Sequence, residues 1–414
     1  MEPFEYRKGE LYCEAVPLRD VADSVGTPTF VYSKTAILEG YRALDRAFAP
    51  VPHLICYAMK ANGNLAVVAA LAKLGAGVDV VSGGELFRAL RAGVPSKRII
   101  FAGVGKTREE MREALKADIL MFNVESGAEL RTLDQVAQEM GVRAPVALRV
   151  NPDVDPQTHK YIATGLKTSK FGIPVAEALA EYEDAARMAG LQVLGVQMHI
   201  GSQLTTLSPF ADSLARMAAL VKELRERRID IQIVDVGGGL GIRYKDERPP
   251  THEEFAATLL PVLKELGGTV LIEPGRAIVG NAGALLTRAL YPKRTQEKRF
   301  LIVDAAMNDL IRPSLYESFH EIRPVRETAG PRVAMDVVGP ICESGDFLAK
   351  DRELPEIAAG DLLAVMSTGA YGFTMSSQYN ARPRAAEVLV ERDRFRIVRR
   401  RETYEDLIAG ESLE

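Results

Sequence analysis

The sequence predicts an α/β fold, a TIM (β/α)8 barrel followed by a second, C-terminal, mostly antiparallel β domain. Between residues 54 and 275, short apolar runs rich in β-branched residues alternate with longer amphipathic stretches. This alternation is typical of βα units around a parallel sheet. The runs number eight, and eight units in about 220 residues match the size of a TIM barrel, whereas an open doubly wound sheet usually has fewer strands.

The predicted barrel strands are separated by stretches with helical periodicity, for example residues 65–74 and 209–227. The strands are expected at residues 54–59, 78–82, 99–102, 119–124, 146–150, 194–200, 231–236 and 270–273. In TIM barrels the active site is built at the C-terminal ends of the strands. Polar residues at the ends of these runs are therefore the first candidates for function.

The chain after Arg276 has short strand-like runs with few long amphipathic stretches between them, which indicates an antiparallel β domain. These runs lie at residues 300–303, 333–338, 361–366 and 387–390. A chain of 414 residues also exceeds the size at which one hydrophobic core usually stops growing. We therefore predict an N-terminal segment, 1–28, that joins the β domain, a barrel over 29–276, and the β domain proper over 277–414.

The composition favours a globular enzyme that acts on small molecules. Hydrophobic residues make up 47% of the chain and charged residues 26%, which is ordinary for a globular protein. The net charge of -4 argues against a general affinity for nucleic acid, because phosphate backbones attract clustered lysine and arginine. We expect no nucleic-acid partner.

The cysteines and the N-terminus predict a cytoplasmic protein. Cys13, Cys56 and Cys342 are odd in number and far apart, which fits neither a disulfide framework nor a CxxC metal site. The N-terminal segment is charged, and no apolar run reaches the roughly 18 residues that a membrane-spanning helix needs. We expect no metal and no membrane association.

A run of glycines follows the seventh predicted strand, in the segment DVGGGLG at residues 235–241. The turn of Gly237, Gly238 and Gly239 can expose backbone N–H groups and cradle a phosphate. A dinucleotide-binding GxGxxG motif is the competing interpretation. It fails because Ile242 or Tyr244 stands where its third glycine belongs.

Lys60 follows the first predicted barrel strand, in the segment CYAMKANGN at residues 56–64. Position alone favours a solvated lysine, because most lysines are exposed. The segment, however, resembles the Tyr-Ala-x-Lys-Ala-Asn segment of the alanine racemase-like class of pyridoxal-phosphate enzymes. The resemblance implies that Lys60 is the residue that carries pyridoxal 5'-phosphate.

The segment EPGR at residues 273–276 closes the eighth predicted strand. TIM barrels often build phosphate sites from the loops after strands seven and eight, so the two glycine turns are expected to converge. In the class that the chain resembles, the Glu of this segment contacts the pyridine nitrogen. The resemblance therefore implies that Glu273 keeps the ring an electron sink, with Gly275 and Arg276 beside the cofactor.

Four further residues match cofactor contacts of that class. The segment HIGSQ at residues 199–203 implies that His199 stacks on the cofactor ring and that Ser202 binds its phosphate. Asp79 and Arg149, in the second and fifth predicted strands, match charged positions near the cofactor lysine. For these two residues an internal ion pair remains the alternative.

The predicted β domain carries the remaining motifs. Without the resemblance, Cys342 would be a small buried hydrophobe. Its segment VGPICESGD, at residues 338–346, resembles the catalytic cysteine loop of the family, which implies that Cys342 is a proton donor. The segment DAAMNDLIRPSLY at residues 304–316 narrows the resemblance to diaminopimelate decarboxylases, and Tyr371 matches a residue that reaches cofactor and substrate.

This resemblance implies decarboxylation of meso-2,6-diaminopimelate to L-lysine by a homodimer, in which the cysteine loop completes the partner subunit's site. The substrate carries a second amino-acid centre at its distal end. Arg276 and Arg312 would bind the distal carboxylate there, and Glu343 would accept from the distal ammonium. Tyr316 and Tyr371 would border the site.

Two alternatives remain open from the sequence. One is a related decarboxylase of a basic amino acid or a carboxylated polyamine, or a racemase, because these enzymes share the barrel motifs. The other is a catalytically silent homologue that binds the cofactor. Retention of both Lys60 and Cys342 argues against the silent homologue.

Overall fold

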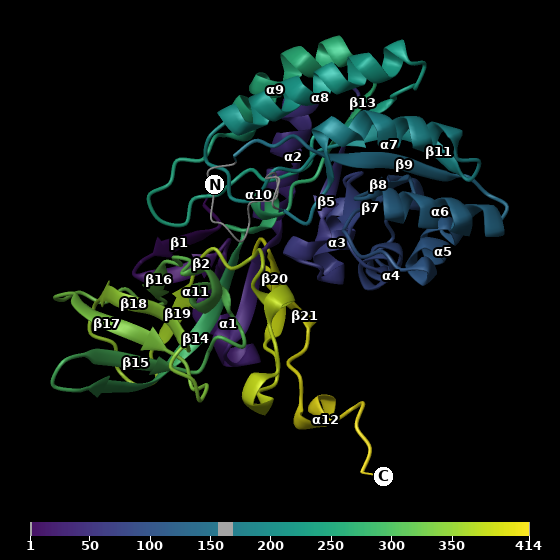
Figure 1. Ribbon diagram of the computed structural model, residues 1–414. Helices are drawn as coiled ribbons and strands as arrows, with labels where there is room; N and C mark the ends of the chain where they lie inside the picture. Colours follow the sequence, from purple (N-terminus) through teal and green to yellow (C-terminus); the bar gives the residue numbers. More distant parts are fainter. Residues whose placement is uncertain (1, 156–168, 414) are drawn as a thin grey trace. The chain divides into compact units, whose positions relative to one another are not determined.

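The computed structural model describes residues 2–155 and 169–413, which fall into two compact units. The barrel unit comprises Glu39–Ile242 and Arg248–Ala277. The β unit comprises Met1–Leu38, Arg243–Glu247 and Ile278–Glu414. Figure 1 labels the helices and strands of both units.

The barrel unit is a closed ring of parallel strands, which confirms the predicted TIM barrel. Among the described residues, eight strands pair side by side in the order β9-β11-β12-β13-β5-β6-β7-β8, and β8 pairs again with β9. The two-residue strand β10 (Ile173–Pro174) pairs in parallel with the last two residues of β9 and is not one of the eight strands that close the ring. The barrel strands are β5 (His53–Ala58), β6 (Gly77–Val80), β7 (Ile99–Phe101), β8 (Met121–Val124), β9 (Ala144–Asn151), β11 (Leu191–Gln197), β12 (Ile233–Asp235) and β13 (Thr269–Ile272).

Every barrel strand begins and ends within three residues of its prediction. The largest difference is at β11, which ends at Gln197 rather than at residue 200. Met198 and Ile200 are buried although they lie beyond the ladder. The strand was predicted too long at this end because buried apolar residues continue past the last residue that pairs in the sheet. His199 therefore lies in the loop that follows β11.

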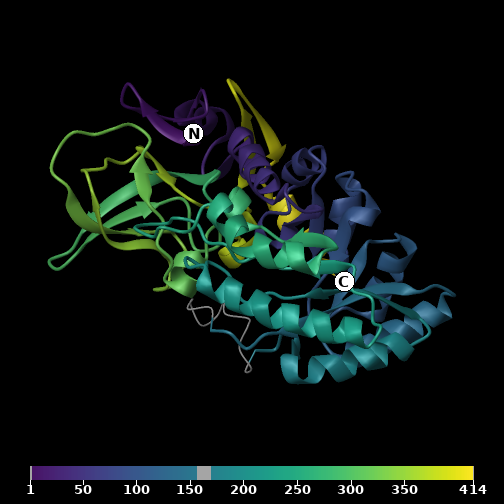
Figure 2. The same ribbon diagram turned by 90° about the horizontal axis from the view of Figure 1, so that it is seen from above.

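Five helices of the barrel begin at polar caps. Asn64, Ser82 and Ser126 each accept a hydrogen bond from the first turn of the next helix, and Thr107 and Thr251 form capping boxes. Helices α8 and α9 pack against each other, as both views show (Figures 1 and 2). The helices are α2 (Lys34–Phe48), α3 (Leu65–Ala72), α4 (Gly83–Arg91), α5 (Arg108–Lys116), α6 (Gly127–Glu139), α7 (Val175–Arg187), α8 (Ser208–Glu226), α9 (His252–Leu266) and α10 (Arg276–Val279).

The β unit is a mostly antiparallel sheet, as predicted. Its main path is β18-β17-β15-β14-β4-β20-β21, with β19 joining β14 to β16. Within the described residues, β15 with β17 and β4 with β20 are the parallel pairs. The strands are β4 (Thr29–Ser33), β14 (Gly283–Arg294), β15 (Arg299–Val303), β16 (Ile322–Pro324), β17 (Val333–Val338), β18 (Phe347–Leu354), β19 (Leu362–Val365), β20 (Ala386–Glu391) and β21 (Arg394–Arg399).

The N-terminal residues contribute to the β unit in two ways. Strand β4 lies between β14 and β20 in the main sheet. Strands β1 (Phe4–Arg7), β2 (Glu10–Cys13) and β3 (Val16–Pro17) form a small sheet of their own, whose apolar side chains pack in one core with residues of β14 and β20. The unit also contains the short helices α1 (Leu18–Val25), α11 (Arg312–Tyr316) and α12 (Tyr404–Leu407). None of the described helices is long and apolar enough to cross a membrane.

Candidate functional site

Polar side chains gather at the C-terminal ends of the barrel strands. Because all eight strands are parallel, these ends lie on one face of the barrel, where TIM barrels carry their active sites. Below this polar layer the barrel interior is apolar. The polar residues are Lys60 after β5, Asp79 in β6, Asn123 in β8, Arg149 in β9, Gln197 and Asp235 at the ends of β11 and β12, and Glu273 after β13.

Lys60 is held in place by Asp79. Its Nζ donates to Asp79 Oδ2 at 2.7 Å. The lysine side chain is 35% exposed, whereas the carboxylate is fully buried. A charge-assisted bond from a buried acceptor fixes the direction of the amine while leaving it open to a ligand. Lys60 is therefore placed as a covalent anchor needs to be.

The buried carboxylate of Glu273 lies within the electrostatic reach of this lysine, and the buried carboxylate of Asp235 interacts with Glu273. Burial raises the pKa of Glu273 well above its usual value, and the negative charges of Asp235 and Asp79 raise it further. Burial likewise raises the pKa of Asp235 to about 6. A cationic N–H group beside them would favour the charged carboxylates again. The pair therefore suits a protonated ring nitrogen.

Two amides bind these carboxylates from other strands of the ring, Asn123 from β8 and Gln197 from β11. Asn123 Nδ2 donates to Asp235 Oδ2 at 3.1 Å and to Glu273 Oε1 at 3.2 Å. Gln197 Nε2 donates to Glu273 Oε1 at 3.3 Å. An amide donor carries no charge, so Asn123 and Gln197 fix the position of Glu273 without neutralising its carboxylate. The carboxylate can therefore still pair with a cation. Asn123, Gln197 and Asp235 are not among the site residues predicted from the sequence, although each is a polar residue in or at the end of a predicted strand.

His199 is neutral in this setting. The backbone N–H of Gly238 donates to His199 Nδ1 at 3.1 Å, so that nitrogen is an acceptor and carries no proton. Burial lowers the pKa of His199 well below its usual value, and the charges of Arg149 and Lys60 add to this effect. A neutral, flat imidazole whose orientation is fixed by the glycine turn is suited to stacking on a planar ligand.

The glycine turn at 237–239 lies too close to its neighbours for side chains. A Cβ on Gly237, Gly238 or Gly239 would clash with the carbonyl oxygen of Met198, Glu273 or Gly201, respectively. Gly237 and Gly239 also have φ of +67° and +116°. The turn is therefore a bare backbone cradle between the loops that follow β11 and β13, as a phosphate site requires.

A positive side chain joins the same two loops. Arg276 opens α10, is 5% exposed, and donates from Nη2 to Ser202 Oγ at 3.0 Å. Gly275 lets this loop approach the end of β5, since a Cβ there would lie 3.0 Å from the Cβ of Ala61, next to Lys60. The predicted residues of the two loops are thus brought together around one small region.

Asp79 and Arg149 do not pair with each other. Arg149 Nη1 donates to Glu125 Oε1 at 2.9 Å, and both side chains are buried. The guanidinium also stacks over the ring of Phe171 and donates to the carbonyl of His199 at 3.2 Å. An internal ion pair therefore exists for Arg149, but its partner is Glu125, which sequence reasoning did not identify. The polar Glu125 directly after a predicted strand was the available signal.

The other predicted residues lie in the β unit. Cys342 and Glu343 are in the loop between β17 and β18, where Cys342 is an exposed free thiol and its N–H donates to Asn380 Oδ1 at 2.8 Å. Tyr371 follows β19 with φ of 56°, a strained backbone conformation for a tyrosine. The exposed thiol contradicts the interpretation of Cys342 as a buried hydrophobe.

Arg312 and Tyr316 stand at the two ends of α11. Arg312 is 6% exposed, and its guanidinium lies over the rings of Tyr244 and Tyr316 at 5.3 and 5.6 Å. A buried arginine between aromatic rings has a fixed plane, which favours bidentate binding of a carboxylate. The predicted barrel residues lie at the C-terminal ends of the barrel strands, and the other predicted residues belong to the β unit. Their roles stay predictions.

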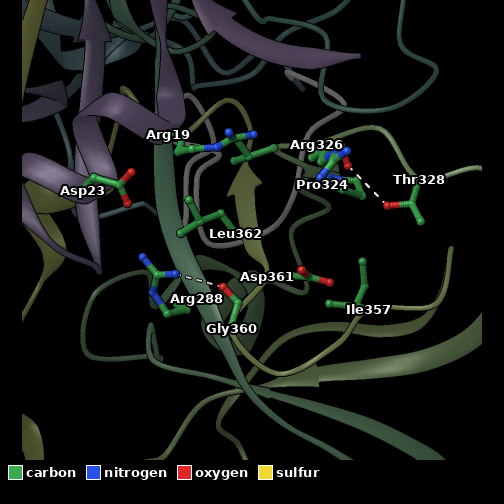
Figure 3. A pocket seen from close by; sticks show the side chains of 11 residues that line it. Arg19, Asp23, Arg288, Pro324, Arg326, Thr328, Ile357, Gly360, Asp361 and Leu362 are labelled. Atoms are coloured by element: carbon green, nitrogen blue, oxygen red, sulfur yellow. Dashed lines mark hydrogen bonds between the residues drawn. The ribbon is translucent and has the colours of Figure 1, made fainter.

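A separate pocket of about 270 Å³ lies in the β unit (Figure 3). Arg19, Arg288 and Arg326 line it together with Asp23 and Asp361. Arg288 donates to the carbonyl of Gly360 at 2.8 Å, and Arg19 pairs with Glu10 at 2.9 Å. None of the residues predicted from the sequence lines this pocket. In the part of the chain that the structure describes, no cluster of His, Cys, Asp or Glu could hold a metal ion.

Comparisons with known proteins agree with this geometry. Residues 34–280 match the family model described as pyridoxal-dependent decarboxylase, pyridoxal binding domain. The chain is 56% identical to the diaminopimelate decarboxylase of Pseudomonas aeruginosa, over 100% of this chain and 99% of that protein. It is 50% identical to that of Aquifex aeolicus, over 98% and 96%.

Solved structures give the same result. The crystal structure of diaminopimelate decarboxylase from Helicobacter pylori complexed with L-lysine is 44% identical, with a TM-score of 0.92 over 95% of this chain and 98% of that chain. The enzyme from M. jannaschii, also in complex with L-lysine, is 39% identical, with a TM-score of 0.95 over 100% and 98%.

Proposed function

Since the chain belongs to the pyridoxal-dependent decarboxylases and, within them, to the diaminopimelate decarboxylase family, we propose that it converts meso-2,6-diaminopimelate to L-lysine and carbon dioxide. The observation that carries the proposal is the Lys60–Asp79 pair beside Glu273 on the C-terminal face of the barrel. This arrangement lies within the matched pyridoxal binding domain.

The residues present fit pyridoxal 5'-phosphate. The bare turn at 237–239, with Ser202 and Arg276, offers N–H, hydroxyl and guanidinium donors to a phosphate. The buried carboxylates of Glu273 and Asp235 suit the protonated ring nitrogen. When bound, the cofactor supplies an electron-withdrawing ring that takes up the electrons left by the departing carboxylate.

The protein's own residues hold the reacting groups. Lys60 would supply the amine that holds the cofactor, and Asp79 directs its Nζ. Glu273 would accept a hydrogen bond from the ring nitrogen of the bound cofactor, and Asn123 and Gln197 hold the carboxylate in position for it. His199 remains neutral, so it adds no positive charge beside the ring.

Cys342 returns the proton that replaces carbon dioxide. A thiol carries an S–H proton, so Sγ can give this proton to the substrate carbon and regain one from water. The exposure of this thiol in its loop supports the assignment, because a donor must reach the reacting carbon. We assign this role to the Cys342 of one subunit acting in the site of its partner, which requires a homodimer.

The distal end of the substrate determines specificity. The L-centre of meso-diaminopimelate is retained in L-lysine, so the protein must bind that centre and expose the D-centre to the cofactor. Arg276 and Arg312 bind the distal carboxylate, and Glu343 accepts from the distal ammonium. Tyr316 and Tyr371 border the site.

The three free cysteines further support a role in the cytoplasm.

A parallel assay tests the function. Purified protein with added pyridoxal phosphate is given meso-diaminopimelate, lysine, ornithine and arginine, and release of carbon dioxide is measured. The other substrates lack a distal carboxylate to match the buried arginine charge, so kcat/KM should favour diaminopimelate by at least about 10³-fold. A preference for ornithine would refute the substrate while leaving the decarboxylase intact. No release from any substrate would support a silent homologue.

A further inference from the structure

His320 is a buried histidine that the proposed mechanism does not use. It follows α11 in the β unit and is 0% exposed. Its ring and the ring of Tyr244 pack in a T-shaped arrangement, with the centroids 5.3 Å apart. Arg352 Nη1 donates to the backbone carbonyl of His320 at 2.7 Å, and the Arg352 guanidinium lies 3.9 Å from the centroid of the neighbouring Phe319 ring. The backbone and the ring are thus both held firmly.

The contacts of His320 fix its tautomer. Nδ1 lies 2.8 Å from the carbonyl oxygen of Met366, and a carbonyl only accepts, so Nδ1 carries the proton. In the neutral ring Nε2 is then an acceptor. It accepts from Arg312 Nε at 3.4 Å, a long bond in a fully buried place. The imidazole therefore connects the loop after β19 to the guanidinium of Arg312.

Arg312 is oriented by several groups at once. His320 binds its Nε edge, Ser318 Oγ accepts from Nη2 at 3.2 Å, and the rings of Tyr244 and Tyr316 lie against the guanidinium. Of these two hydrogen-bond acceptors, His320 is the more rigid, because the imidazole is itself anchored to the Met366 carbonyl. A serine hydroxyl, in contrast, rotates freely.

We propose that His320 is a positioning residue that acts through Arg312 and sets how tightly the distal carboxylate of the substrate binds. The inference rests on the proposed function, which assigns that carboxylate to Arg312. A guanidinium binds a carboxylate with two parallel bonds only when its plane is directed correctly. His320 supplies this direction by accepting from Nε. It touches neither cofactor nor substrate.

A purely structural role makes a different prediction. His320 would then matter because it satisfies the Met366 carbonyl, and the contact with Arg312 would be incidental. Two amide substitutions separate the roles. The side-chain amide of asparagine reaches the position of Nδ1, and that of glutamine reaches the position of Nε2. His320→Asn therefore keeps the bond to Met366 and loses Arg312, whereas His320→Gln keeps an acceptor for Arg312 and loses Met366.

The test measures kcat and KM for meso-diaminopimelate and the inhibition constant of L-lysine, whose carboxylate is the distal one retained from the substrate. His320→Asn should raise KM and the inhibition constant about tenfold or more, with kcat within about threefold of wild type. His320→Gln should stay within about threefold in all three. His53→Asn is the matched control, because His53 Nδ1 also lies 3.0 Å from a backbone carbonyl, that of Val51, and should change none of them.

The Arg312→Ala background provides a second check. Without the guanidinium, His320→Asn and His320→Gln should become equivalent in KM, since the partner on which they differ is absent. The inference is overturned if Gln is impaired and Asn is not, if both are impaired equally, or if they still differ without Arg312. Wild-type protein that does not decarboxylate diaminopimelate would instead overturn the proposed function, which the same assay reveals first.

Discussion

Lys60 and Glu273 owe their chemistry to the groups around them. A lysine after a strand is ordinarily solvated, but here its Nζ is bound to the fully buried carboxylate of Asp79 at 2.7 Å. Glu273 is surrounded by two further carboxylates, so burial and negative charge together favour its protonated form until a cation arrives. Single substitutions in this cluster are therefore expected to change how the protein binds the cofactor.

The first prediction concerns the covalent anchor. Borohydride should fix pyridoxal phosphate on Lys60, because this amine is directed to the face where the glycine turn and Glu273 converge. Peptide mapping of the reduced protein locates the modification. Lys60→Ala should lose the trapped cofactor and reduce kcat at least about 10³-fold. Lys73→Ala, at an exposed lysine after α3, is the control. Trapping on another lysine would contradict the assignment.

The second prediction concerns the pH dependence of stability without cofactor. Burial raises the pKa of Asp235 from 3.8 to about 6, so between these values the folded protein holds a proton that the unfolded chain releases. Since the folded state binds more protons there, its free energy of unfolding falls as the pH rises through this window. Asp235→Asn removes this loss. The stability of the variant relative to wild type should therefore increase by about 2 kcal/mol from pH 4 to pH 7.

Denaturant unfolding of the cofactor-free proteins at several pH values measures this difference. Saturation with pyridoxal phosphate should reduce it, because a ring cation favours the charged carboxylates. Asp134→Asn serves as the control, since Asp134 is a partly exposed carboxylate on α6 outside the cluster. A stability difference that does not change with pH would show that Asp235 is charged in the folded protein.

At the scale of elements, the glycine turn after β12 is the part least tolerant of change. Its backbone contacts the loops that follow β11 and β13, and their carbonyl oxygens leave no space for a side chain. Local sequence identified the turn because three consecutive glycines are unusual. It did not identify which carbonyl groups close it, since those belong to other βα units.

The third prediction tests this turn. Gly238→Ala should weaken binding of pyridoxal phosphate about tenfold or more, because the added methyl group clashes with the carbonyl oxygen of Glu273 and displaces the cradle. Fluorescence titration of the cofactor-free protein gives the affinity. Gly105→Ala is the matched control, as no atom lies within 4 Å of a Cβ there. Equal affinities in the two variants would exclude the turn from the phosphate site.

At the scale of the whole molecule, the two units carry different parts of the proposed reaction. The barrel unit holds Lys60, Glu273 and the phosphate cradle, and the β unit holds Cys342 and Arg312. If the cysteine loop of one subunit serves the site of the other, a chain that lacks either Lys60 or Cys342 forms only inactive homodimers. A mixture of the two inactive chains can form a dimer with an active site.

The fourth prediction is complementation between subunits. Lys60→Ala and Cys342→Ala should each be inactive, and an equal mixture after subunit exchange should recover up to roughly a quarter of wild-type activity. Random two-fold pairing makes half of the dimers mixed, and each mixed dimer has one intact site of two. Activity is measured after exchange has been confirmed with differently tagged chains. If the mixture stays inactive, each site is built from a single subunit.

The sequence by itself determined the closed eight-stranded barrel and which segments lie at the C-terminal ends of its strands. Strand periodicity is a local property, and parallel strands bring their C-terminal ends to one face, so the sequence pattern alone places Lys60, the glycine turn and the EPGR segment there. The antiparallel β domain followed in the same way from short runs after Arg276.

Only the tertiary structure decided the partners. Arg149 binds Glu125 from the neighbouring strand end, Asn123 and Gln197 bind Glu273 across the barrel, and Arg312 is directed by His320. Each contact depends on ring closure or on the path of a loop, which a one-dimensional pattern does not contain. Buried polar groups must find partners wherever the fold brings a donor and an acceptor together, and that choice is made in three dimensions.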